Sequence, residues 1–320
     1  MLGTIRNMNI VDCHLHVFPW IHGMRQGNLE TKGERFGYVR LVGDGANKID
    51  RYLPPSFHYT SSEPEVALEY MKDARVAKAV LLQAPCYGNH NEFLSDVAKR
   101  YPDKFTAFAL VDPRRPKDAV SELERAVEEL GLKGVKFEIP DTPFYPDEER
   151  YRAIWESILQ LEIPVVVDLG WGEGEYYFLL ENIRAVLRNY PELRMCIAHL
   201  GVSRLWDPAQ KYPFPELQKT LSLAEESPNV RFDIAGLPNA TAFMGKGEEE
   251  YPYPRLQDVI RVSCEKAGAN TVMWGSDYPS VLVSCTYKQN IQIVTEHCDF
   301  LSKREKSMIM GENALNFFLF

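Results

Sequence analysis

Short apolar runs recur along the whole chain, and stretches with helical periodicity lie between them. Runs rich in valine, isoleucine, leucine and phenylalanine are typical of parallel strands that are buried on both faces. The eight runs are Met8–Cys13, Ala79–Gln83, Thr106–Val111, Gly134–Glu138, Pro164–Asp168, Met195–His199, Val230–Ala235 and Thr271–Ser276. They predict eight parallel strands.

The intervening stretches predict amphipathic helices. In Pro116–Leu130, apolar side chains recur every three or four residues, and Gly131 follows as a helix stop. Alternating strands and helices indicate an α/β protein, and eight such units favour a closed (β/α)8 TIM barrel over an open sheet. No glycine-rich phosphate-binding turn follows any run, which weakens a nucleotide-binding alternative. The other predicted helices are Glu148–Leu161, Glu175–Asn189, Pro215–Glu226 and Arg255–Ala267.

Two connections break this pattern. The first two predicted strands are joined by a long connection that includes residues 18–62, which are rich in aromatic residues, glycine and proline. A long insertion at this end of a barrel strand is usually a lid or part of a substrate pocket. A second irregular stretch, Pro238–Pro254, contains the polar run Gly245–Glu250, which we expect to be mobile and solvated. No linker marks a second domain, so we expect residues 1–320 to form one domain with 18–62 as a lid.

Composition and charge narrow the function classes. The chain has 320 residues with a formal net charge of -9, and its lysines and arginines are scattered, so nucleic acid is an unfavourable partner. No two of its six cysteines form a C-x-x-C pair, which excludes zinc knuckles and thioredoxin-type motifs. No apolar run is long enough to cross a bilayer, so we expect no membrane partner and a reduced cytoplasmic compartment.

Candidate chemistry collects where the predicted strands end, which is where barrel enzymes place their catalytic groups. His14 and His16 are two residues apart on one strand and point to the same face, so they can share a metal ion. Imidazole and carboxylate ligands suit zinc, manganese or iron. The polar residues at strand ends are Asp12, His14, His16, Lys136, Glu138, Asp168, His199 and Asp277.

Three segments in this order resemble the amidohydrolase superfamily, and its amidohydrolase-related branch in particular. They are Val11–His16, His199–Gly201 and Gly275–Pro279. That branch contains aminocarboxymuconate-semialdehyde and resorcylate decarboxylases, with pyrone-dicarboxylate lactonases as relatives. The resemblance implies a TIM barrel that binds one divalent ion and acts on a small molecule, and it suggests a homodimer.

The resemblance also implies roles for individual residues. His14 and His16 match the first metal-binding pair, Asp277 matches an aspartate that binds metal or transfers a proton, and His199 matches a histidine that binds or polarises the substrate. The branch commonly has a histidine ligand on the fifth strand, where this chain has Asp168. A carboxylate can still bind metal, and the alternative is a weakened or absent metal site.

Other strand-end and loop residues have two interpretations each. Lys136 and Glu138 share a strand face, and they form either a structural ion pair or a substrate-binding and proton-transfer pair. Trp20 and Tyr278 either pack a planar substrate or fill the barrel mouth. Asp12 is expected to orient a histidine from behind the metal.

We expect metal-assisted hydrolysis of a small lactone, ester or amide, with zinc the first choice and manganese or iron possible. Asp277 would take the proton of the attacking water and pass it to the leaving group, and His199 would stabilise the developing oxyanion. The first alternative is metal-dependent decarboxylation of an aromatic or unsaturated acid by the same ligand set. The second is a metal-poor barrel that only binds a ligand, which the departure at Asp168 suggests. In each case the partner is a small molecule, anionic or aromatic.

Overall fold

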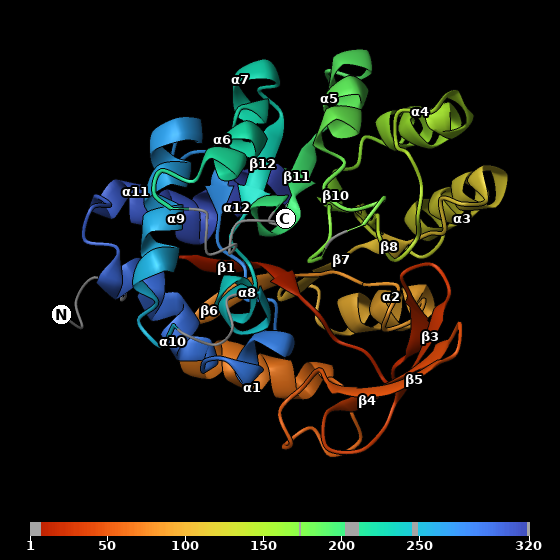
Figure 1. The fold of residues 1–320 in the computed structure, drawn as a ribbon, viewed down its shortest axis with the longest axis horizontal. Coiled ribbons are helices and arrows are strands. Elements are labelled where there is room, and N and C mark those ends of the chain that lie inside the picture. Colours follow the sequence, from red (N-terminus) through yellow and green to blue (C-terminus); the bar gives the residue numbers. More distant parts are fainter. Residues whose placement is uncertain (1–7, 173, 202–210, 245–248, 319–320) are drawn as a thin grey trace.

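The computed structural model describes residues 8–172, 174–201, 211–244 and 249–318. All eight predicted strands are present within these ranges, and they form a ring of parallel strands (Figure 1). The run predicted over 106–111 is divided into two short strands by Phe108. The strands are β1 (Ile10–Leu15), β6 (Val76–Leu81), β7 (Phe105–Ala107), β8 (Ala109–Leu110), β9 (Val135–Glu138), β10 (Val165–Asp168), β11 (Met195–Ile197), β12 (Val230–Asp233) and β13 (Val272–Met273).

The ring closes between the first and the last strand. β1 pairs with β6 and β6 with β7, while β8 through β13 pair in sequence order, all in parallel. The backbone N–H of Cys13 donates to the Trp274 carbonyl at 3.2 Å, and Leu15 forms a parallel bridge with Tyr278. Closure therefore brings the carboxyl ends of β1 and β13 together, although they are far apart in the sequence.

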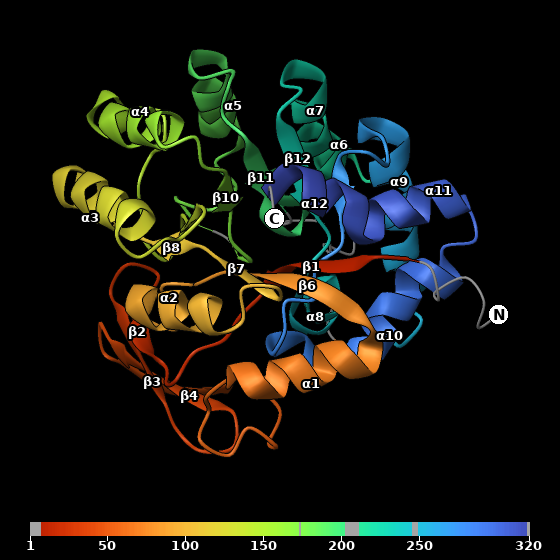
Figure 2. The ribbon, with the colours of Figure 1, turned by 180° about the vertical axis from the view of Figure 1, so that it is seen from behind.

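Most of the helices surround this ring (Figure 2). Three predicted helices differ from the structure in detail: 148–161 begins with a short 3-10 turn at Glu149–Tyr151, 175–189 is helical only from Leu180, and 215–226 is divided at Ser222. The helices are α1 (Pro64–Ala74), α2 (Asn91–Arg100), α3 (Pro116–Glu128), α4 (Arg152–Gln160), α5 (Leu180–Asn189), α6 (Pro215–Leu221), α7 (Leu223–Glu226), α8 (Leu237–Met244), α9 (Pro254–Ala267), α10 (Tyr287–Gln292), α11 (Lys303–Ser307) and α12 (Asn313–Phe318).

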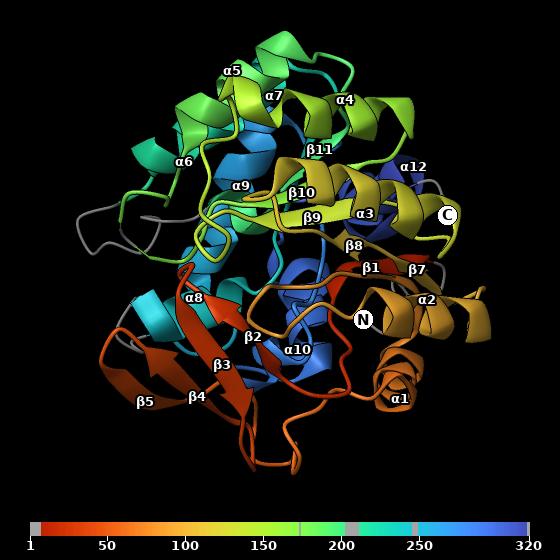
Figure 3. The same cartoon turned by 90° about the vertical axis from the view of Figure 1, so that its right-hand side faces the viewer.

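The barrel interior is apolar, and α12 covers one end of it. Side chains from several strands, including Val11, Val80 and Val166, form one buried cluster with Phe317 and Phe318 of α12. Seen from the side, α12 lies at one end of the barrel, and α8 lies towards the other, together with the insertion that follows β1 (Figure 3). The open end of the barrel is thus the one that carries the polar strand ends.

The insertion predicted as a lid loop is a four-stranded antiparallel sheet in the order β2-β3-β4-β5. Three of its strands are mostly polar and exposed or half-buried, without a regular polar and apolar alternation, so sequence patterning did not separate them from a loop. The sheet is attached to the barrel because Met24 N donates to Pro85 O at 2.9 Å and His22 N to Tyr87 O at 3.1 Å. The strands are β2 (His22–Arg25), β3 (Leu29–Gly33), β4 (Tyr38–Gly43) and β5 (Ala46–Arg51).

The second irregular stretch begins with a helix rather than a loop, because α8 covers residues 237–244. The polar run Gly245–Glu250, expected to be mobile, lies largely outside the described residues, which resume at 249. Among the described helices, none combines the length and the apolar character needed to cross a bilayer.

Candidate active site

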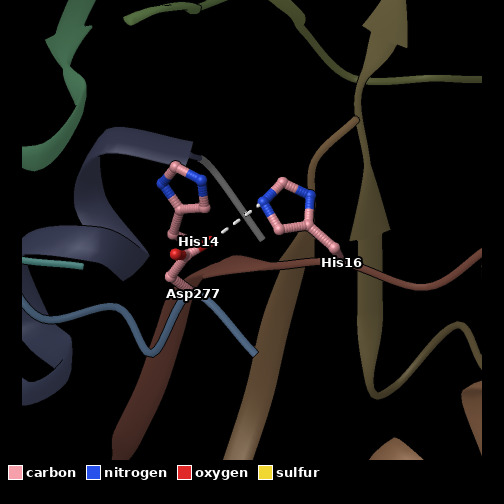
Figure 4. Close-up of side chains that lie close together, drawn as sticks. All are labelled: His14, His16 and Asp277. Carbon is pink, nitrogen blue, oxygen red and sulfur yellow. Dashed lines mark ion pairs between the residues drawn. The ribbon is translucent and has the colours of Figure 1, made fainter. Parts of the chain in front are cut away.

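Three side chains meet where the barrel closes: His14 on β1, His16 directly after it, and Asp277 after β13 (Figure 4). One ligand atom from each lies within 4.8 Å of the others, and all three residues are buried. His16 Nε2 is 3.3 Å from Asp277 Oδ1, and Asp277 N donates to the His14 carbonyl at 2.8 Å. The sequence prediction that these three residues gather at one site is therefore consistent with the geometry.

The His14 ring is arranged as a metal ligand would be. Its Nδ1 is 3.0 Å from Asp233 Oδ2, and because an ionised carboxylate only accepts, Nδ1 carries the proton. Burial, followed by the charges of His199 and Lys136, holds the pKa of His14 well below its usual range, so the ring is neutral. Its Nε2 atom is buried and has no hydrogen-bond partner among the described residues. A buried lone pair without a partner is costly unless something binds it.

His16 and Asp277 complete a set of donors that suits a divalent cation. The Leu82 carbonyl accepts a hydrogen bond from His16 Nδ1 at 2.9 Å, which leaves Nε2 facing Asp277. Burial works against ionisation of Asp277, but the His16 ring at 3.3 Å and the charge of His199 lower its pKa, so it is a carboxylate. Two imidazoles and one carboxylate with open positions are a ligand set used by catalytic zinc and by related metals.

His199 lies beside this group and carries a fixed positive charge. Its Nδ1 donates to the Ala235 carbonyl at 2.8 Å, and its Nε2 is 3.3 Å from Asp168 Oδ2. Both ring nitrogens therefore face acceptors. Although burial opposes protonation, the carboxylate of Asp168 raises the pKa of His199 to about 9. The His199 and His14 ring centroids are 4.6 Å apart, so this imidazolium is adjacent to the candidate metal ligands.

Asp168, which the sequence analysis expected as a fourth metal ligand, lies beside His199. It does not gather with His14, His16 and Asp277. Its carboxylate instead pairs with His199 and accepts a hydrogen bond from Gly170 N at 2.7 Å. Burial opposes ionisation, but the His199 imidazolium holds the pKa of Asp168 well below its usual range. The carboxylate is thus used to keep His199 charged.

Asp12 does not orient a histidine ring, in contrast to the sequence expectation. Its Oδ1 accepts from the backbone N–H groups of His14 at 3.1 Å and Ser276 at 2.8 Å, and its Oδ2 accepts from Tyr287 Oη at 2.7 Å. Burial raises the pKa of Asp12 to about 6. Asp12 therefore ties β1 to the end of the eighth strand.

Asp233, which the sequence analysis did not single out, orients the His14 ring and holds the backbone of His199. It accepts from His14 Nδ1 through Oδ2 and from the His199 backbone N–H at 2.8 Å through Oδ1. It ends the apolar strand β12 as Asp168 ends β10, and this position is the signal that could have identified it.

A cavity of about 470 Å³ opens from this group, and its lining includes His16, Asp277, His199, Lys136 and Glu138. Lys136 Nζ is 3.5 Å from Glu138 Oε2, a loose ion pair that leaves the buried ammonium directed at the cavity. Burial disfavours the charge on Lys136, but the carboxylates of Glu138 and Asp168 raise its pKa, so it remains cationic.

The insertion sheet contributes three further cations to the cavity, Arg25, Lys48 and Arg51, and Lys48 is ion-paired with Asp50 at 2.9 Å. Arg25 donates to the Tyr52 hydroxyl, and Arg51 Nη2 donates to the Tyr38 hydroxyl at 2.6 Å. Within the described part of the chain, no carboxylate forms an ion pair with either guanidinium. These arginines were also missed by the sequence analysis, because their contribution depends on how the sheet packs over the barrel.

Two residues predicted to bind substrate do not line this cavity. Tyr278 is fully buried, with its ring 5.3 Å from that of Tyr70 and 6.0 Å from that of Tyr287. Trp20 is 59% exposed and contacts the edge of the His90 ring. The burial of Tyr278 favours a packing role for it, whereas the exposed Trp20 favours neither interpretation.

Comparison with known proteins agrees with this architecture. A family model described as an amidohydrolase matches residues 11–320. A 2-amino-3-carboxymuconate-6-semialdehyde decarboxylase from Dictyostelium discoideum is 22% identical across 96% of this chain and 90% of that protein. A γ-resorcylate decarboxylase from Rhizobium radiobacter is 34% identical, but the match covers only 23% of this chain and 24% of that protein.

Solved structures show the same fold at low identity. A probable 2-pyrone-4,6-dicarboxylic acid hydrolase from Acinetobacter baumannii, with citric acid bound, has a TM-score of 0.67 and 19% identity, covering 98% of this chain and 100% of that chain. A dihydroxybenzoic acid decarboxylase from a Polaromonas species, with bound manganese and 2-nitroresorcinol, has a TM-score of 0.59 and 17% identity, covering 81% and 87% of the two chains. These similarities confirm the predicted α/β barrel class.

Proposed function

This chain belongs to the amidohydrolase family, and we propose that it is a metal-dependent hydrolase of a small lactone, ester or amide. One observation carries the proposal. His14 Nε2 is buried without a partner, beside the ligand atoms of His16 and Asp277. A bound cation would satisfy that atom, and it would leave open positions for a substrate.

His14, His16 and Asp277 would hold one divalent ion, with zinc, manganese and iron all compatible with the donors. A relative in the same fold is described with bound manganese. Such an ion acts as a Lewis acid, which polarises a carbonyl group and promotes attack by water. Asp168 is not needed in this set, because its carboxylate is engaged by His199 at 3.3 Å.

Two side chains would handle the proton and the negative charge that hydrolysis produces. Asp277 is a carboxylate at the cavity wall, so it can accept the proton of the attacking water. The His199 imidazolium provides a fixed positive charge beside the reacting carbonyl, which stabilises the oxyanion. Asp168 and Asp233 hold that imidazolium in place through its Nε2 atom and its backbone N–H.

The cavity favours an anionic substrate. Lys136, Arg25 and Arg51 all line it, and neither arginine has an ion-paired carboxylate among the described residues. Guanidinium groups bind planar carboxylates through paired hydrogen bonds. Tyr52 and Tyr87 add aromatic surface to the same lining. The insertion sheet would thus act as part of the substrate pocket rather than only as a cover.

Decarboxylation of an aromatic or unsaturated acid is the second candidate. Two curated relatives are named as decarboxylases of such acids. The same cations would bind the substrate carboxylate, and Asp277, after taking up a proton from solvent, would deliver that proton to carbon before carbon dioxide leaves. The ligand set serves both reactions, so the product distinguishes them.

The experiment is turnover in ¹⁸O-labelled water with a panel of aromatic lactones, aryl esters and dihydroxybenzoates. We expect one ¹⁸O atom in the carboxylate product of a lactone or ester, detected by mass spectrometry. Release of carbon dioxide with deuterium on the ring in heavy water would instead support the lyase. His14→Ala and Asp277→Asn should lower kcat/KM at least 10³-fold, of the order expected when a catalytic metal site is lost.

His22→Ala is the matched control, because His22 is an exposed histidine on β2 that pairs with Glu30 at 2.8 Å. Its kcat/KM should remain within twofold of the unaltered protein, of the order expected for surface substitutions. Unchanged rates in His14→Ala or Asp277→Asn would refute the site.

A further inference from the structure

The two carboxylate oxygens of Asp277 face different partners. Oδ1 lies 3.3 Å from His16 Nε2, on the side of the candidate metal ligands. Oδ2 accepts a hydrogen bond from the Ser280 hydroxyl at 2.6 Å. The same oxygen lies against the turn after β12, because a Cβ atom added at Gly236 would be 2.6 Å from it. Oδ2 is therefore already engaged by the protein, and Oδ1 is the oxygen left for a ligand.

The Ser280 hydroxyl has one hydrogen and two possible acceptors. Ser280 begins the short 3-10 helix Ser280–Val283, and its Oγ is 2.6 Å from Asp277 Oδ2 and 2.8 Å from the Asp277 carbonyl oxygen. That carbonyl already accepts from the backbone N–H of Val281 at 3.1 Å. An ionised carboxylate is the stronger acceptor of the two. The geometry thus favours donation of the Ser280 hydrogen to the carboxylate.

The helix α8 fixes the direction of this hydrogen bond. Asn239 on α8 is 3% exposed, and its Nδ2 donates to Ser280 Oγ at 3.2 Å. The Ser284 hydroxyl donates to Asn239 Oδ1 at 2.6 Å, which turns the amide nitrogen towards Ser280. Because Ser280 Oγ accepts from Asn239, its own hydrogen remains for Asp277. Three hydrogen bonds in a row therefore point towards the Asp277 carboxylate.

This support matters because the metal ligands repel one another. As ligands, Asp277 Oδ1 and His16 Nε2 each present a lone pair, and they lie 3.3 Å apart. A carboxylate without support would turn away from the ring. We propose that Ser280, supported by Asn239, is a positioning residue that holds Asp277 Oδ1 towards the metal position. The effect on metal binding rests on the proposed function, whereas the positioning of the carboxylate does not.

Zinc affinity of the full chain, measured by competition calorimetry, tests the effect on metal binding. We expect Ser280→Ala to bind zinc about 10- to 100-fold more weakly, the usual loss when the support of a metal ligand is removed. Ser280→Thr keeps the hydroxyl and should retain the affinity of the unaltered protein. Unchanged affinity in Ser280→Ala, or equal losses in Ser280→Ala and Ser280→Thr, would overturn the role of the hydroxyl.

Ser95→Ala is the matched control. The Ser95 hydroxyl on α2 also belongs to a buried residue and donates to the Leu130 carbonyl at 2.6 Å, but Ser95 does not line the cavity. Its loss should leave zinc affinity unchanged. A decrease in Ser95→Ala as large as that in Ser280→Ala would show that any lost buried hydroxyl weakens the site, and it would overturn the specific role of Ser280.

The His16 ring reports the position of Asp277 without any ion. The measurement is the NMR chemical shift of His16 Nε2 at fixed pH in chelator-treated protein, with the resonance assigned from His16→Gln. We expect a changed shift in Ser280→Ala and in Asn239→Leu, and an unchanged one in Ser280→Thr and Ser95→Ala. An unchanged His16 resonance in Ser280→Ala would overturn the positioning. Failure of the unaltered protein to bind zinc would instead overturn the proposed metal centre, and the His16 resonance would still decide the positioning.

Discussion

Some active-site residues can be predicted from the sequence, whereas their contacts with one another cannot. His14, His16, Asp277 and His199 follow apolar strands in recognisable segments, so their gathering was predictable. The ion pair between Asp168 and His199 was not predictable, because a contact between the ends of β10 and β11 leaves no pattern in the sequence. Residue identity thus predicts which side chains enter the site, while their hydrogen bonds decide which atoms remain available for a ligand.

The ion pair between His199 and Asp168 predicts a pH response. Burial opposes the charge, but Asp168 raises the pKa of His199 from 6.5 to about 9. The protonated ring therefore stabilises the folded state fully below about pH 6.5, and this contribution is lost as the pH rises through about 9. In Asp168→Asn, the pKa of His199 should fall, because burial then opposes the charge and only the smaller effects of the Asp233 and Asp277 carboxylates still favour it.

NMR titration of the His199 ring in metal-free protein measures this shift, with the resonance assigned from His199→Gln. Asp50→Asn is the control, because Asp50 also lines the cavity but pairs with Lys48 at 2.9 Å. The Asp50→Asn variant should not change the pH midpoint of the His199 titration. A midpoint near 9 that persists in Asp168→Asn would contradict the assignment of Asp168 as the residue that keeps His199 charged.

At the scale of elements, regular patterning predicted the barrel well and the insertion poorly. Buried parallel strands are continuous apolar runs, so their positions can be read from the pattern of apolar residues along the chain. The strands β2 and β5 have the sequences HGMR and ANKIDR and are largely exposed or half-buried, so they resemble loop sequence. Their structure depends on antiparallel pairing and on attachment to residues 85–87, which are contacts between distant segments.

The turn between β12 and α8 offers a prediction at this scale. Gly236 has a φ of +62°, and a Cβ atom added there would lie 2.6 Å from Asp277 Oδ2. In Gly236→Ala, the Asp277 carboxylate should therefore be displaced from its position beside His16. We expect metal affinity to fall by about 10- to 100-fold, as when the support of a metal ligand is lost.

Gly131→Ala is the matched control, because Gly131 also has a positive φ of +80° but a Cβ there would have no atom within 4 Å. Both variants should lose about 1–2 kcal/mol of unfolding free energy from backbone strain, measured by urea denaturation. Only Gly236→Ala should lose metal affinity in a calorimetric titration. Equal metal affinity in the two variants would show that Gly236 does not constrain Asp277.

At the scale of the whole molecule, the site exists only because the barrel closes. His14 lies near the start of the chain and Asp277 near its end, and the contact of β1 with the segment after β13 brings them together. The insertion sheet then adds Arg25 and Arg51 above the open end of the barrel. A ligand that binds across this closure would couple metal affinity to the folding of the entire barrel.

The most direct test of the central claim is the metal content of the purified full chain after loading with zinc or manganese and removal of free ions. We expect about one ion per chain in the unaltered protein and in Asp168→Asn, and less than about a tenth in His14→Ala, His16→Ala and Asp277→Asn, because metal binding requires the assembled ligands. An unaltered protein that retains no ion, or an Asp168→Asn variant as depleted as Asp277→Asn, would contradict a metal centre formed by His14, His16 and Asp277.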